Sequence, residues 1–235
     1  MQGIKGILFD KDGTLVDFQK TWFAIGDLMA LQAAEGDRTR ADALLTLAGY
    51  DFDGQRFKAD SVFAAGTNAE IVALWYPDAS ELERQTITAG FNTMTAEAGA
   101  AASVPLPGSK DAIAVLHGSG FRLGVATNDS TSGAEQTLLA LGIAQMFEAA
   151  YGYDAVANPK PAPDAIHAFA DLTGLKPSEI AMVGDNRHDL EMARAGGAGL
   201  AVAVLSGTGT RETLAPMADV ILNSVADLPG FLGRI

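Results

Sequence analysis

The chain reads Ile7-Leu8-Phe9-Asp10-Lys11-Asp12-Gly13-Thr14-Leu15 near its N-terminus. A short apolar run changes here into two carboxylates that are separated by a single position. Side chains at positions i and i+2 of an extended segment point to the same side of the backbone. We therefore expect Asp10 and Asp12 to converge at the carboxyl end of a buried strand. A cation or a shared chemical task must offset their repulsion.

The composition is that of an acidic chain without cysteine. Its 235 residues, of which 48% are hydrophobic, suit one large domain or a core with a smaller insertion. The net charge of −13 argues against nucleic acid as a partner, although a metal ion and a local lysine can still hold an anionic substrate. No run has the roughly eighteen apolar residues of a membrane span, and no signal peptide is evident. We expect a cytoplasmic protein without disulfides or membrane contact.

Strands and helices alternate over most of the chain after residue 105. Apolar runs predict strands at residues 4–9, 121–126, 147–151, 180–183, 200–205 and 220–222, and helices at 110–116, 132–141, 163–172 and 189–195. Such alternation implies parallel pairing through right-handed crossovers. Because the strand at 4–9 finds its partners only after residue 105, the sequence predicts an α/β, Rossmann-like parallel sheet interrupted by an insertion.

The insertion shows helical rather than strand periodicity. Four stretches carry apolar stripes, which contain Trp22, Leu44, Ile71 and Leu82. Pro77 ends the third stretch, and Ser80 has a side chain suited to an N-cap for the fourth. We therefore predict an all-helical cap at residues 18–101 and an α/β core made of residues 1–17 and 102–235.

Three further polar motifs follow the predicted strands of the core. They are Thr127-Asn128-Asp129, Asn158-Pro159-Lys160-Pro161 and Gly184-Asp185-Asn186, the last with Asp189 four residues after Asp185. Ligands of open α/β sheets bind outside the carboxyl ends of the strands. Thr127 and Asp185 should therefore lie with the two acids of the first motif at one edge of the sheet.

The ordered set of motifs resembles the haloacid dehalogenase-like superfamily. A single Asp-x-Asp would be weak evidence, whereas Asp-x-Asp-Gly-Thr, a threonine after a strand, a lysine and Gly-Asp-x-x-x-Asp occur here in the family's order. The insertion after the first motif resembles the helical cap of the phosphoglycolate phosphatase-like members. The resemblance implies a magnesium-dependent phosphatase for a small phosphorylated metabolite, with phosphoglycolate as the default guess.

The resemblance also assigns roles to individual residues. Asp10 would attack phosphorus to give an aspartyl-phosphate, and Asp12 would protonate the leaving alkoxide and then take a proton from water. Thr127 and Lys160 would contact the transferring phosphoryl group. The implied Mg²⁺ ligands are Asp10, the backbone carbonyl of Asp12, Asp185 and Asp189. The substrate-binding residues would be Gly13, Thr14, Asn128 and Phe18.

Signals in the cap and in two other segments are weaker. Phe18 and Trp22 share one helix face and either form the cap core or wall the leaving-group side of the pocket. Related caps reach the site with a turn like that at residues 65–68, and Arg56 and Lys58 are either solvated charges or anion contacts. We assign surface or structural roles to His117, His167 and His188. The loop Gly207-Thr208-Gly209-Thr210 lacks the lysine of a nucleotide phosphate loop and is predicted to cap a helix at Arg211.

Two alternatives to a phosphatase stay open. A sugar-phosphate mutase of the same superfamily shares the core and the cap, and differs in what attacks the aspartyl-phosphate. A non-catalytic binding module on this fold would carry a degenerate site, against which the intact acids argue. Dehalogenation and phosphonate cleavage are disfavoured because neither has a use for the acid at Asp12. The sequence leaves open a monomer or a homodimer.

Overall fold

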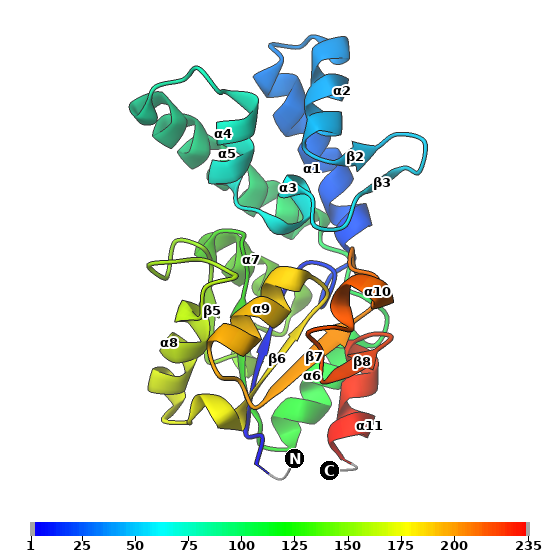
Figure 1. The fold of residues 1–235 in the computed structure, drawn as a ribbon, viewed down its shortest axis with the longest axis vertical. Coiled ribbons are helices and arrows are strands. Elements are labelled where there is room, and N and C mark those ends of the chain that lie inside the picture. Colours follow the sequence, from blue (N-terminus) through cyan, green and yellow to red (C-terminus); the bar gives the residue numbers. More distant parts are fainter. Residues whose placement is uncertain (1–2, 234–235) are drawn as a thin grey trace.

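A parallel sheet forms the centre of the core. The computed structural model describes residues 3–233, so both extreme ends of the predicted core lie outside the described residues. The strands are β1 (Gly6–Phe9), β4 (Arg122–Ala126), β5 (Ala149–Tyr151), β6 (Ile180–Gly184), β7 (Leu200–Val204) and β8 (Val220–Leu222). They form one sheet in the order β5-β4-β1-β6-β7-β8, with every neighbouring pair parallel (Figure 1). The predicted α/β parallel sheet is confirmed, and the structure places its first strand between β4 and β6.

Helices cover both faces of this sheet. They are α6 (Ser109–Gly118), α7 (Thr131–Leu141), α8 (Asp164–Thr173), α9 (Arg187–Ala195), α10 (Arg211–Leu214) and α11 (Leu228–Leu232). Ile7 and Phe9 of β1 belong to the apolar cluster with α6, α7 and α11, whereas Leu8 belongs to the cluster with α8, α9 and α10. Successive side chains of a strand point to opposite faces, so β1 is apolar throughout because both of its faces are covered.

A second layer of helices lies over the carboxyl ends of the strands (Figure 1). It contains α1 (Phe18–Ala33), α2 (Arg38–Leu47), α3 (Val62–Ala65), α4 (Asn68–Trp75) and α5 (Glu81–Ala102), with a short antiparallel pair, β2 (Tyr50–Asp51) and β3 (Arg56–Phe57). The sequence did not predict this pair because strands of two residues are too short to show a period. These elements have an apolar core of their own, which supports the proposed division of the chain near residues 18 and 102.

Two adjacent crossings connect the cap with the core. The Asp17 N–H donates to the Val104 carbonyl at 2.8 Å, and Val16 forms a bridge with Pro105. The Asp17 side chain also caps α1, and Ser80 forms a capping box with Glu83 at the start of α5, as its side chain predicts. Helix α5 packs against α7 of the core. Within residues 3–233 no helix has the length and apolar character needed to cross a bilayer.

Phe169 of α8 fills the space between this helix and the sheet. Its ring is fully buried, and a Cβ at Gly124 of β4 would lie 2.8 Å from it. Phe169→Ala should lower the free energy of unfolding by about 3–5 kcal/mol, because it leaves a cavity that the sheet cannot fill. Leu172 lies on the same helix and is 53% exposed. In urea unfolding, the free energy of unfolding of Leu172→Ala should differ from that of the original chain by no more than about 0.5 kcal/mol. Equal losses for the two variants would contradict this packing.

Candidate active site

One pocket between the sheet and the cap collects the predicted residues. The predicted residues in its lining are Asp10, Asp12, Phe18, Thr127, Asn128, Lys160, Asp185 and Asp189. The other two, Gly13 and Thr14, do not line the pocket but lie next to Asp185. The cap adds the turn between α3 and α4, including Gly66 and Asn68, together with Trp22. The structure therefore brings all the predicted site residues together, while their roles remain predictions.

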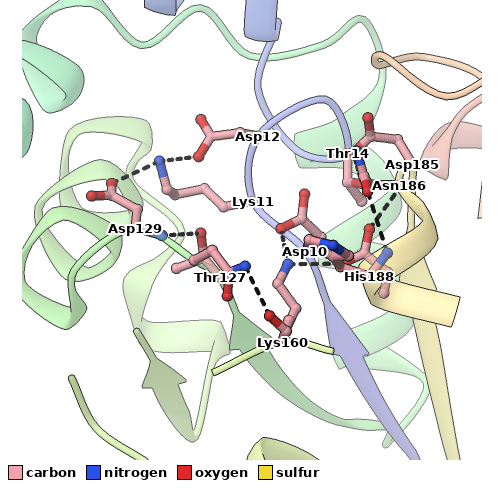
Figure 2. Close-up of polar contacts among 12 residues, drawn as sticks. Asp10, Lys11, Asp12, Thr14, Thr127, Asp129, Lys160, Asp185, Asn186 and His188 are labelled. Carbon is pink, nitrogen blue, oxygen red and sulfur yellow. Dashed lines mark hydrogen bonds and ion pairs between the residues drawn. The ribbon is translucent and has the colours of Figure 1, made fainter. Parts of the chain in front are cut away.

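Asp10 and Asp189 share the ammonium group of Lys160. Asp10 is the first residue after β1, and its N–H donates to the Val183 carbonyl of β6 at 2.8 Å. The Lys160 Nζ lies 2.6 Å from Asp10 Oδ1 and 2.7 Å from Asp189 Oδ1 (Figure 2 shows Asp10 and Lys160). Burial raises the pKa of Asp10 to about 7, against the lowering effect of Lys160. Burial lowers the pKa of Lys160, but the two carboxylates outweigh it, so the pKa lies above its usual value.

Asp185 is held by hydrogen bonds and by close contact with glycine backbone rather than by a lysine. The Thr208 N–H donates to its Oδ2 at 2.7 Å, and the Thr14 hydroxyl lies 3.5 Å from its Oδ1. Gly13 has a φ of 87°, and a Cβ there would approach the carboxylate to 2.7 Å. A Cβ at Gly207 would overlap the same carboxylate. Burial and the repulsion from Asp10 and Asp189 raise the pKa of Asp185 well above its usual value.

The sequence analysis found only part of the role of the loop at residues 207–210. Thr210 caps α10 as predicted. The same loop also holds Asp185, through Thr208, and the Ser206 hydroxyl donates to the Gly13 carbonyl at 2.7 Å. The only signal of this role in the sequence is that Thr208 has a glycine on each side. Such a pattern is common in loops and does not identify its partner.

Asp10, Asp185 and Asp189 have the arrangement of a cation site. One carboxylate oxygen from each residue lies within 4.8 Å of the other two, and all three residues are buried. Lys160 offsets one of the three negative charges, so a divalent cation would offset the remaining two. Hard cations such as Mg²⁺ prefer oxygen ligands of this kind. Asp189 Oδ2 also accepts the Asn186 N–H at 2.9 Å, so Asp189 is held at both oxygens before any ion binds.

The carboxyl group of Asp12 points to a different partner. Lys11 Nζ lies 2.6 Å from Asp12 Oδ2 and 3.1 Å from Asp129 Oδ2 (Figure 2). The Trp22 indole N–H donates to Asp12 Oδ1 at 2.6 Å. Burial lowers the pKa of Lys11, but Asp12 and Asp129 outweigh it and raise the pKa above its usual value. The two acids of the first motif therefore face one pocket but are each neutralised by a separate lysine, and the sequence analysis missed Lys11.

Core side chains also hold the cap turn over the site. The Ala65 carbonyl accepts from Asn128 Nδ2 at 2.8 Å and lies 3.1 Å from Nδ1 of His188, which also lines the pocket. The Thr127 hydroxyl accepts the Asp129 N–H at 3.1 Å, so its own proton is free to donate. Arg56 and Lys58 are exposed and do not line the pocket. The two remaining histidines, His117 and His167, are exposed as predicted.

Comparisons with known proteins support the motif analysis. The model of the haloacid dehalogenase-like hydrolase family matches residues 4–197. A phosphoglycolate phosphatase of Salmonella typhimurium is 32% identical over 99% of this chain and 94% of its own length. A predicted phosphoglycolate phosphatase from Haemophilus somnus is similar in structure, with a TM-score of 0.75, 23% identity and 99% coverage of both chains. CbbY from Rhodobacter sphaeroides, solved in complex with phosphate, has a TM-score of 0.70, 24% identity and 96% coverage of both chains.

Gly207 offers a test of the cation site. The methyl group of Gly207→Ala would displace the Asp185 carboxylate, so we expect Mg²⁺ to bind about 10–100-fold more weakly in isothermal titration calorimetry. Gly230→Ala in α11, where a Cβ would meet nothing within 4 Å, is the matched control and should bind Mg²⁺ normally. Unchanged affinity in Gly207→Ala would remove Asp185 from the set of ligands.

Proposed function

The chain belongs to the haloacid dehalogenase-like hydrolase family, and we propose that it is a phosphatase for a small phosphomonoester. The observation that carries this proposal is the buried set of Asp10, Lys160 and Asp185 at the carboxyl edge of the sheet. A carboxylate beside one lysine and a place for a divalent cation suits a phosphoryl group, which carries two negative charges. Phosphoryl transfer depends mainly on positioning and on charge stabilisation.

Asp10 would act as the nucleophile. One of its oxygens attacks phosphorus, an O–P bond forms to give an aspartyl-phosphate, and the bond from phosphorus to the ester oxygen breaks. Burial raises the pKa of Asp10 to about 7 even though Lys160, at 2.6 Å, lowers it. Further positive charge beside Asp10 would therefore be needed to keep it ionised at neutral pH. Water then attacks phosphorus, releases phosphate and restores the Asp10 carboxylate.

The cluster of Asp10, Asp185 and Asp189 is the proposed place for Mg²⁺, with the backbone carbonyl of Asp12 as a further ligand. When bound, the ion would screen the phosphate from the nucleophile and polarise its oxygens. The chain itself prepares this place, since Thr208, Gly13 and Gly207 confine the Asp185 carboxylate. The charge balance fits a divalent ion because one lysine faces three buried carboxylates.

The other predicted site residues would hold the phosphoryl group and move the proton. The free hydroxyl proton of Thr127 and the backbone N–H groups of Thr14 and Asn128 are the proposed donors to the phosphoryl oxygens. Asp12 would give a proton to the leaving alkoxide and later take one from the attacking water. The cap would exclude bulk water, and its aromatic residue Phe18 would contact the leaving group.

The substrate is proposed to be a small phosphorylated metabolite. Relatives named phosphoglycolate phosphatase make phosphoglycolate the first compound to assay. The net charge of −13 supports a chain that acts without a nucleic acid partner. We further propose a cytoplasmic enzyme that works as a monomer or as a homodimer.

The proposed function is tested by replacing the nucleophile. Asp10→Asn should lower the kcat for release of phosphate from 4-nitrophenyl phosphate with Mg²⁺ by at least about a thousandfold, since the amide is a far poorer nucleophile than a carboxylate. Asp171→Asn, on the exposed surface of α8, should retain full activity. Phosphate should be the product, whereas an isomerised sugar phosphate would indicate a mutase. Activity close to normal in Asp10→Asn would exclude the mechanism.

A further inference from the structure

Asp12 is held from two directions, by the core and by the cap. Lys11, in the loop after β1, contacts one carboxylate oxygen at 2.6 Å. Trp22, one turn into α1 of the cap, donates its indole N–H to the other oxygen at 2.6 Å. An ionised carboxylate has about four lone-pair sites. The two contacts therefore fix the plane of the carboxyl group and leave sites for the proton that Asp12 is proposed to carry.

The contact from the core is made by Lys11, which a second core residue holds in place. The Lys11 side chain is 1% exposed, and its ammonium group also lies 3.1 Å from Asp129 Oδ2. Asp129 is fixed in turn, because its Oδ1 accepts the Ser130 N–H at 2.7 Å at the start of α7. Lys11 is thus held by an ion pair within the core, and by itself it restrains only one oxygen of Asp12.

The contact from the cap depends on the position of α1. The Trp22 ring stacks on Phe18 at 6.4 Å between ring centroids and meets the edge of Phe63 at 6.1 Å, and both neighbours belong to the cap. Lys11 Nζ lies 5.2 Å from the centroid of the same indole, which adds a cation–π contact across the two domains. The indole is therefore held by cap residues, and its contact with Asp12 joins the cap to the core in the position that the structure shows.

We propose that Trp22 is a positioning residue that orients Asp12 for proton transfer when the cap covers the substrate. The inference rests on the proposed phosphatase function. Once the N–H is removed, Asp12 keeps only the Lys11 contact and its carboxyl group is free to rotate. Proton transfer to the leaving oxygen then becomes less efficient, because general acid catalysis requires close and aligned groups. A purely structural anchor would instead affect every substrate to the same degree.

The leaving group separates these two roles. A benzyl alkoxide needs a proton as it leaves, whereas 4-nitrophenolate leaves readily without one. Trp22→Phe keeps an aromatic ring but lacks the N–H, so its kcat for benzyl phosphate should fall at least about tenfold more than its kcat for 4-nitrophenyl phosphate. Steady-state assays with Mg²⁺ and circular dichroism spectra of each variant measure the effect. Trp22→Leu should show the same selective loss and serves if the phenylalanine variant is not folded.

Trp75→Phe is the matched control. Trp75 is a buried tryptophan of the same cap, its N–H donates to the Leu44 carbonyl at 3.0 Å, and it does not line the pocket. Its replacement should change the kcat values for the two substrates by the same factor. Equal losses on the two substrates in the folded Trp22 variants would overturn the inference and leave the phosphatase intact. Failure of the original chain to hydrolyse either ester would overturn the proposed function, and the inference with it.

Discussion

Buried negative charge is the constraint on which this site depends. Five carboxylates, at Asp10, Asp12, Asp129, Asp185 and Asp189, line one pocket at the carboxyl edge of the sheet. Two buried lysines divide them into two groups, since Lys160 pairs with Asp10 and Asp189, and Lys11 pairs with Asp12 and Asp129. Within residues 3–233 Asp185 pairs with no lysine, so Lys160 faces three carboxylates, and the two negative charges that it leaves unbalanced favour a divalent cation. Buried charges persist only when they are paired or bind metals.

The fold brings this charge together from distant parts of the chain. Parallel strands end at one edge of the sheet, so the loops after β1, β4 and β6 meet there, and the loop after β7 holds Asp185 from outside (Figure 1). The insertion after β1 places the cap over the same edge. Asn128 and His188 of the core contact its Ala65 carbonyl, and Trp22 of the cap contacts Asp12. The core thus places Asp10 and Asp12, the proposed nucleophile and acid, while the cap completes the surroundings of Asp12.

The sequence predicted the parallel sheet, the helical insertion and several of the residues that line the pocket, because these follow from local patterns. Strands show as apolar runs, and each site residue follows one of them. The contacts that the sequence did not predict join residues that are far apart in the chain. Nothing near Lys11 shows that Asp129 will neutralise it, and nothing near Gly207 shows that Asp185 will lie against it. The same holds for β2 and β3, whose pairing is set by the packing of the cap rather than by a period in the sequence.

The central claim is that Asp10 carries the phosphoryl group during turnover, and trapping that intermediate tests it most directly. The protein would be mixed with 4-nitrophenyl phosphate and Mg²⁺, quenched in acid within the first turnover, digested and analysed by mass spectrometry. The account predicts one added phosphoryl group on the peptide that contains Asp10, and none when the ester is omitted. Rapid release of phosphate with no phosphorylated peptide at any quench time would contradict the account. A phosphoryl group on a residue other than Asp10 would contradict it as well.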